Sequence, residues 1–265
     1  MKQYLDLLTD VMTNGVDTPN RTGINARSVF GRQLRFNLEN GFPLLTTKKM
    51  WFRGIVQEFI WMVVNGSVDV TELERQGNNI WSAWKGSDGT IGQGYGINFR
   101  RIQDGDQIID QVSDIITSLR ADPDSRRHVM SMWQAQNVRR TTLHPCHGTV
   151  IQFNSHNGKL DLSTYQRSAD LFLGFSWNIA FYAIFLHVMA QLTNHKVGEL
   201  VYSLGSAHVY HNHFDAVYEQ LSREPLPLSS LNLNLSINNI DNFLLKDFSL
   251  EGYNAWPAIK APVAI

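Results

Sequence analysis

The sequence predicts an α+β protein. Apolar residues recur at the helical period in several segments, other segments carry Val, Ile, Phe, Thr and Tyr in strand-like runs, and the two kinds do not alternate strictly. The chain has 265 residues, 43% of them hydrophobic and 11% aromatic, so it can bury one large core. No linker, repeat or low-complexity tract interrupts it. We therefore expect a single domain over residues 1–265.

Helices are predicted from apolar spacing and from end signals. The segment 2–14 ends at Asn14-Gly15, a common C-terminal signal. Residues 52–64 carry apolar side chains at 52, 55, 56, 59, 60 and 63, which share one helical face. The remaining predicted helices span 70–76, 108–120, 176–193 and 211–221. The apolar stretch 171–192 contains Ser, Asn, His and Gln, so it is expected to be a buried helix rather than a membrane span.

Strands are predicted at 27–38, 128–133 and 201–204 and in one hairpin. Asn157-Gly158 is the strongest signal for a two-residue hairpin turn, and strand-like runs flank it at 149–154 and 159–165. Pairing about this turn places position 148 opposite 167 and 146 opposite 169, to within one or two residues. The thiol of Cys146 is then expected beside an arginine and a hydroxyl at one end of a sheet.

Composition restricts the class of protein. The net charge of −1 gives no electrostatic support for nonspecific nucleic-acid binding, and no nucleic-acid partner is expected. A single cysteine excludes an intramolecular disulfide and suits a reducing compartment, and no apolar signal segment follows Met1, so we expect a cytoplasmic protein without a membrane partner. The histidines at 208, 211 and 213 lack a Cys or carboxylate cluster, so no metal is expected.

Cys146 is the candidate nucleophile. A free thiol has a pKa of roughly 8.5, and a neighbouring guanidinium such as that of Arg167 favours the thiolate. A buried structural cysteine is an equally open interpretation on spacing alone. His147 is an unlikely base, because adjacent residues on a strand point to opposite faces.

Several other polar residues are candidates for binding or proton transfer. Arginines at 21, 126, 127 and 167 lie in loops beside hydroxyls or glycine and suit a phosphate, although each alone could be a solvated surface residue. Glu58 lies among apolar helical neighbours, where burial raises a carboxyl pKa; the alternative is a boundary residue beside Arg53 or Gln57. Asn178 suits the O4 and N3–H edge of a uracil, or is a satisfied core amide.

The aromatic and histidine candidates have equally plain alternatives. His208 and Tyr210 share one face of an extended segment and could bind a sugar hydroxyl or be boundary residues. Trp81 and Trp84 offer flat surface for a conjugated ring, although aromatic pairs are more often core.

Together these motifs resemble those of the thymidylate synthase family across nearly the whole chain, in the same order. The matching segments are Arg21-Thr22-Gly23, Phe42 to Lys48, the helix around Glu58, Asp122 to Arg127, Pro145-Cys146-His147, Tyr165 to Asp170, Asn178-Ile179-Ala180, His208-Val209-Tyr210 and Lys260 to Ile265. The resemblance implies a large mixed or antiparallel sheet packed with helices, with one sheet face at the interface of a homodimer.

The resemblance also implies the chemistry. Cys146 adds to C6 of dUMP, and C5 then attacks the methylene of the co-substrate 5,10-methylenetetrahydrofolate. Glu58 moves protons through water, Tyr95 assists removal of the C5 proton, and Asn178 reads the uracil edge. Substrate binding is implied for Arg21, Gln166, Arg167, Ser168, His208 and Tyr210, with Arg126 and Arg127 donated by the other subunit. Folate binding is implied for Trp81, Trp84, Leu143, Asp170, Gly174 and Ile265, and Asp170 also counts as catalytic.

Four motifs depart from the family pattern. The family has Trp-Asp, Gln-Trp-Arg, Pro-Phe-Asn and Gly-Asp-x-His where this chain has Trp81-Ser82, Asn98-Phe99-Arg100, Ser176-Trp177-Asn178 and Gly205-Ser206-Ala207-His208. Two of these departures resemble phage deoxycytidylate hydroxymethylases, in which water rather than hydride captures the C5 methylene. Those enzymes read cytosine with Asp, whereas this chain has Asn178.

We therefore expect a deoxyuridylate hydroxymethylase of phage type, with thymidylate synthase as the alternative. A third hypothesis is a catalytically silent nucleotide- or RNA-binding homologue. The joint presence of Cys146, Glu58, Tyr95 and Asn178 argues against it.

Overall fold

The computed structural model describes residues 1–263 and has a six-stranded sheet at its centre. The order is β1-β2-β8-β7-β6-β5; β7 and β8 pair in parallel, and the other neighbours pair antiparallel. This mixed sheet, packed with helices, confirms the α+β prediction. Its strands are β1 Val16–Thr18, β2 Ala26–Asn37, β5 Val129–Met130, β6 Val150–His156, β7 Lys159–Asp170 and β8 Lys196–Tyr210.

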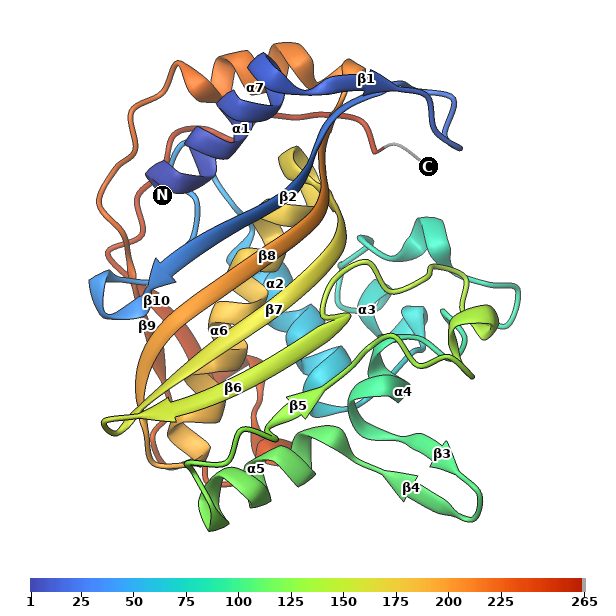
Figure 1. Cartoon of the computed structure of the whole chain (residues 1–265), viewed down its shortest axis with the longest axis vertical. Helices are drawn as coiled ribbons and strands as arrows, with labels where there is room; N and C mark the ends of the chain where they lie inside the picture. The colour runs from blue at the N-terminus through green and yellow to red at the C-terminus, as the bar shows by residue number, and fades with distance from the viewer. Residues whose placement is uncertain (264–265) are drawn as a thin grey trace.

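One face of the sheet is covered by helices α6 (Ser176–Leu192) and α2 (Phe52–Phe59), which lie behind it in Figure 1. The segment Leu171–Leu192 is long and apolar enough to cross a membrane, but 78% of its most apolar window is buried inside the protein. It is therefore the central core helix, as expected from its polar residues. Phe59, Phe153, Phe181 and Phe185 meet between helices and sheet.

Within residues 1–263, no helix covers the opposite face of the sheet. Val150 and Tyr165 pair directly across β6 and β7 and are 46% and 36% exposed, and Phe30 on β2 is 78% exposed. Isolated apolar side chains are normal on a protein surface, but several on one sheet face form a candidate interaction surface.

The other elements surround this two-layer centre. Helices α1 (Lys2–Asn14) and α7 (Phe214–Leu221) lie at one end of the sheet, at the top of Figure 1. The remaining helices are α3 Val70–Glu74, α4 Tyr95–Arg100 and α5 Gln111–Ala121, and two small hairpins are formed by β3 Ile102–Asp104 with β4 Gln107–Ile109 and by β9 Ser230–Leu233 with β10 Phe248–Glu251.

The predicted helices are confirmed, with altered ends. The predicted helix 52–64 is α2 followed by a π-helical turn, Ile60–Val64. The helix predicted at 108–120 begins at Gln111, because its apolar start belongs to β4 and Asp110 caps the helix by accepting from the Ser113 N–H. The helix predicted at 211–221 begins with a 3-10 turn, His211–His213.

The strand predictions were less accurate in length. Only Val129–Met130 of the predicted strand 128–133 forms a regular strand, β5. Conversely, the short strand predicted at 201–204 is the middle of β8, which runs from Lys196 to Tyr210.

The hairpin is confirmed, but its register changes beside Cys146. Asn157 and Gly158 have φ of 50° and 73°, as a two-residue turn requires, and Val150 pairs with Tyr165. Gly148 then adopts a φ of 63°, which ends the regular ladder. The Arg167 N–H consequently donates to the Cys146 carbonyl at 2.8 Å, a shift of two residues from the predicted pairing of 146 with 169, which is at the limit of the one or two residues allowed for the register.

Candidate active site

Cys146 lies in the loop before β6, in contact with Tyr95 at the start of α4. The Tyr95 Oη lies 3.4 Å from the sulfur. The same oxygen accepts the backbone N–H groups of Cys146 at 2.7 Å and His147 at 3.3 Å. Because two donors already point at this oxygen, its own hydrogen is free to point at the sulfur, where it stabilises a thiolate.

Burial and charge act in opposite directions on the thiol. Burial raises the pKa of Cys146, whereas the Tyr95 hydrogen bond and the positive charge of Arg167 act to lower it. The Arg167 guanidinium is fastened to the cysteine loop, because its Nε donates to the Pro145 carbonyl at 2.8 Å and an Nη donates to the His144 carbonyl at 3.0 Å. The arrangement holds a cation near the thiol of a half-buried cysteine.

His147 is occupied elsewhere and is not paired with the thiol. Its ring stacks on Tyr95 with centroids 4.3 Å apart, and its Nδ1 lies 2.8 Å from the Tyr182 Oη. Burial lowers the pKa of His147 to about 3, so the imidazole is neutral at physiological pH. A Cys-His dyad of the protease kind is therefore not formed by these neighbours.

Glu58 is buried on α2 between two tryptophans. The Trp81 indole N–H donates to Oε1 at 2.6 Å, and the Trp177 indole N–H donates to Oε2 at 2.5 Å. Burial raises the pKa of Glu58 to about 7, while the hydrogen bonds from Trp81 and Trp177 oppose that rise. Neither Arg53 nor Gln57 is its hydrogen-bonding partner, and a carboxyl with this pKa can both hold and release a proton near neutrality.

Asn178 lies in the first turn of α6 and is part of a buried amide network. Its Nδ2 donates to the Gln166 Oε1 at 3.3 Å, and the Tyr202 hydroxyl donates to the same oxygen at 2.9 Å. Gln166 in turn donates to the Ser168 carbonyl at 2.9 Å. The orientation of the Asn178 amide is thus fixed, with Oδ1 and one N–H left for another group.

The ends of β7 and β8 bring four further predicted residues together. Ser168 pairs with Ser206, and Asp170 pairs with His208. His208 and Tyr210 have ring centroids 5.2 Å apart on the same face. Burial and the nearby Asp170 raise the pKa of Tyr210, and Arg21 opposes them, so the exposed Arg21 acts electrostatically on this group.

Asp170 joins the sheet to α6. Its Oδ1 accepts the backbone N–H groups of Phe172 and Leu173 and so caps the π-helical turn Leu171–Phe175. Gly174 lies in this turn, and an added Cβ there would meet no atom within 4 Å. Leu143 is half-buried in the loop before Cys146.

Arg126 and Arg127 are exposed just before β5. Neither forms an ion pair within residues 1–263. Trp84 packs edge-on against Trp81, with centroids 5.6 Å apart. The predicted folate contact Ile265 lies outside the described residues.

The structure adds three residues to which the sequence assigned no role. Trp177 and Tyr182 lie on α6 with Asn178, and the four-residue spacing of Asn178 and Tyr182 was a signal that both share one helical face. Lys48 is buried over the Phe172 ring, and its Nζ donates to the Phe172 carbonyl. Burial lowers the pKa of Lys48 to about 7, and Asp170 opposes this.

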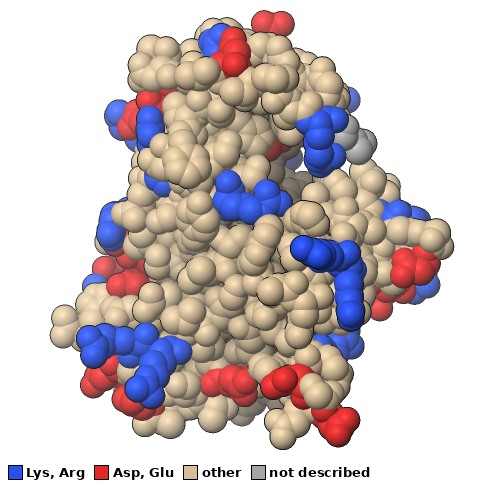
Figure 2. Space-filling model, turned by 45° about the vertical axis from the view of Figure 1, so that its right-hand side comes forward, with Lys and Arg blue, Asp and Glu red and all other residues tan. Residues whose placement is uncertain are grey.

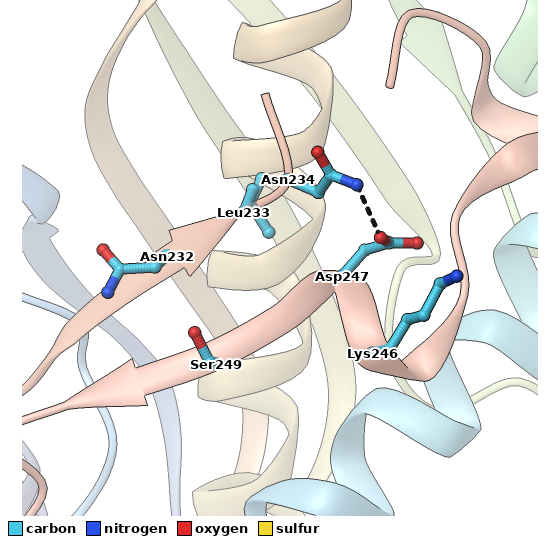
Figure 3. Close-up of a pocket in the computed structure, with 6 residues that line it drawn as sticks. All are labelled: Asn232, Leu233, Asn234, Lys246, Asp247 and Ser249. Carbon is cyan, nitrogen blue, oxygen red and sulfur yellow. Dashed lines mark hydrogen bonds between the residues drawn. The ribbon is translucent and has the colours of Figure 1, made fainter. Parts of the chain in front are cut away.

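The charge and shape of the surface agree with an anionic ligand. Figure 2 shows a recess in the upper half of one face with Lys and Arg side chains around it. A separate pocket at β9 and β10 is lined by Asn232, Leu233, Asn234, Lys246, Asp247 and Ser249 (Figure 3). There Asp247 is engaged by Asn234 at 2.8 Å and by the Leu244 N–H, so its carboxylate stabilises the turn. No cluster of three or more potential metal ligands occurs in the part of the chain that the structure describes.

The site therefore combines a hydrogen-bonded thiol, a fastened guanidinium, a fixed amide and a buried carboxyl with a pKa near 7. Such a set defines an enzyme that could activate a ring by thiolate addition and move protons beside it. The family model described as thymidylate synthase matches residues 2–265, and the chain belongs to this family.

Membership confirms the resemblance and defines the coarse chemistry. The family transfers a one-carbon unit from 5,10-methylenetetrahydrofolate to C5 of dUMP. Its members bind dUMP and folate, are soluble and are typically dimeric.

Proposed function

We propose that the protein is a deoxyuridylate hydroxymethylase. It converts dUMP, 5,10-methylenetetrahydrofolate and water into 5-hydroxymethyl-dUMP and tetrahydrofolate. Hydride capture would instead give dTMP and dihydrofolate, the thymidylate synthase outcome. The observation that carries the proposal is the contact between Trp177, a departure from the family pattern, and Glu58.

In the proposed mechanism the Cys146 thiolate adds to C6 of the uracil, and C5 becomes a carbon nucleophile. C5 forms a bond to the folate methylene, loses its proton, and expels tetrahydrofolate to leave an exocyclic methylene. Water adds to this methylene and gives up a proton, and the thiolate then leaves C6. The Tyr95 hydroxyl, 3.4 Å from the sulfur, supports the thiolate at the beginning and the end.

Glu58 is proposed as the group that accepts the proton of the attacking water. Each of its oxygens holds one indole donor, which leaves acceptor capacity for a water molecule at a fixed orientation. Its pKa, which burial raises to about 7, matches the requirement for a general base at neutral pH.

The proposed binding roles follow the chemistry of the groups. Arg21, Arg167 and Ser168 hold the phosphate, with Arg126 and Arg127 contributed by a second subunit, because guanidinium forks match phosphate oxygens. Asn178, held by Gln166, reads the uracil edge, and His208 and Tyr210 hold the sugar. The folate is proposed to contact Trp81, Trp84, Leu143, Asp170, Gly174 and Ile265. The uncovered sheet face is the proposed homodimer interface.

The choice of water over hydride depends on a small energy difference. A change of ~1.4 kcal/mol in the competition between the two captures alters the product ratio tenfold. Of the four departures, Ser82 bonds to Glu74, Asn98 bonds to the Met132 carbonyl, and Ser206 pairs with Ser168 in the sheet, so these three have structural partners. Trp177 instead contacts the group proposed to activate water.

Product analysis tests the proposal. The protein is incubated with dUMP and 5,10-methylenetetrahydrofolate, with Cys146→Ser as the control for catalysis at this thiol. We expect 5-hydroxymethyl-dUMP with an equal amount of tetrahydrofolate. Stoichiometric dTMP and dihydrofolate would show that the protein is a thymidylate synthase and not a hydroxymethylase. Formation of neither 5-hydroxymethyl-dUMP nor dTMP would favour a silent binding homologue.

A further inference from the structure

We infer that Trp177 is a positioning residue for Glu58, and that Gly54 is the position that makes room for it. The inference concerns the carboxyl group that the proposed function uses to accept a proton. It does not depend on which product the enzyme forms.

The two indoles reach Glu58 from different parts of the fold. Trp81 precedes the 3-10 turn Ser82–Trp84, and Trp177 lies on α6 next to Asn178. Their N–H groups take one carboxylate oxygen each, at 2.6 and 2.5 Å. A carboxylate with both oxygens held by rigid donors has one orientation, and Trp177 relates that orientation to the helix that carries Asn178.

Gly54 lies one helical turn before Glu58 on α2. A Cβ at Gly54 would come within 2.8 Å of the outer ring of Trp177 and still closer to the ring of Trp51. The indoles of Trp51 and Trp177 pack edge-on, with ring centroids 6.4 Å apart. Any larger residue at position 54 would therefore collide with the space that the Trp177 ring occupies.

Two phenols lie near the carboxyl. Tyr182 on α6 is within electrostatic reach of Glu58, and Tyr95 on α4 packs against Trp81 at 5.8 Å. Burial raises the pKa of both phenols well above 10, so both are neutral in the working range. Within the described residues, the hydrogen bonds that stabilise the ionised Glu58 side chain are therefore the two from indole N–H groups.

The test removes one N–H and keeps an aromatic ring. In Trp177→Phe we expect the Glu58 pKa to rise by about one to two units, because a hydrogen bond to a charged group is lost. At pH 7 the ionised fraction would fall from about one half to about one tenth or less. The carboxyl is followed by 13C NMR in protein labelled at the glutamate side-chain carboxyl, with assignment by its loss in Glu58→Gln.

Trp51→Phe is the matched control, because it removes an indole from the same cluster without removing a hydrogen-bond donor to Glu58. In this variant the titration midpoint of the Glu58 carboxyl should not change. An unchanged Glu58 midpoint in folded Trp177→Phe would overturn the inference. If that variant does not fold, a pH titration of the native protein tests the same inference. Two of its seven indole N–H signals must titrate with the Glu58 carboxyl, and Glu58→Gln must abolish this titration. A titration seen in only one indole signal would also overturn it. These measurements do not depend on turnover. They can therefore contradict the role of Trp177 while the proposed product is correct, and product analysis can contradict the proposed product while the role of Trp177 is correct.

Discussion

The environment of the Cys146 thiol is formed by neighbours that the fold brings to it. Burial raises the pKa of the thiol, and Tyr95 and Arg167 oppose that effect. In Cys146→Ser a hydroxyl replaces the thiol, and an alcohol is a far poorer nucleophile at neutral pH. We expect turnover to fall on the order of a thousandfold or more. Mass spectrometry with a 5-fluoro analogue of dUMP and the folate should detect a covalent adduct on the native chain and none on the variant; a variant with full turnover would contradict the assignment.

Glu58 gives the protein a specific dependence of stability on pH. Burial raises the pKa of Glu58 from 4.5 to about 7, which corresponds to about 3 kcal/mol at 1.36 kcal/mol per unit. The folded state binds this proton more tightly, so the stabilisation is complete below pH 4.5 and is lost as pH rises through 7. Between pH 5 and 8 the free energy of unfolding of the native protein should fall, relative to Glu58→Gln, by about 2.5 kcal/mol. Urea unfolding at both pH values measures this, and parallel pH profiles would contradict it.

The residues of the site differ in how far sequence could predict their neighbours. Cys146 and Arg167 are brought together by one hairpin, whose Asn157-Gly158 turn is a local signal. The partners of Glu58 are 23 and 119 residues away along the chain. No local pattern specifies such contacts, so burial of Glu58 was predictable and its two indole donors were not.

At the scale of elements, the end of the hairpin can be tested through Gly148. Its φ is 63°, and an added Cβ would collide with the Tyr182 hydroxyl that bonds His147. Gly148→Ala should therefore be destabilised by strain plus collision, about 2–4 kcal/mol in total. Gly158→Ala is the control, because its φ is 73° and no atom lies near the added carbon, so it should lose only about 1 kcal/mol. Urea unfolding compares the two, and equal losses would exclude the collision.

Element types were more predictable than element ends. The apolar period identified α2 and the long apolar stretch identified α6, whereas only the middle of β8, between Gly198 and Gly205, was predicted as strand. Both glycines are explained by tertiary contacts, since a Cβ would collide with Asp161 at Gly198 and with Tyr165 and the Arg167 backbone at Gly205. Such close approaches are not visible in a single strand.

At the scale of the whole molecule, the uncovered sheet face predicts self-association. We expect sedimentation at twice the 30.2 kDa of one chain. Phe30→Lys places a charge in that face and should shift the protein toward monomer. Leu235→Lys is the control, because Leu235 is 83% exposed and lies outside the sheet. A monomeric native protein, or equal effects of the two changes, would contradict the proposed interface.

Subunit mixing tests whether Arg126 and Arg127 act across that interface. Cys146→Ser and the double change Arg126→Ala with Arg127→Ala should each be nearly inactive alone. An equal mixture that exchanges subunits should recover about a quarter of native activity, because half of the dimers contain one complete site. The rate of product formation is measured after mixing, and no recovery despite proven exchange would show that the arginines do not act in the partner's site.

The continuous path from β7 through the Leu171–Phe175 turn into α6 has a mechanical consequence. Strand and helix carry Arg167, Ser168 and Asn178, and Asp170 and Gln166 tie them together with hydrogen bonds. The groups that would bind a base and those that would bind a phosphate are therefore held at a fixed distance from one another. A nucleoside lacking the phosphate, or a nucleotide with a longer spacer, could not satisfy both ends at once, so the proposed site would discriminate between ligands by their length.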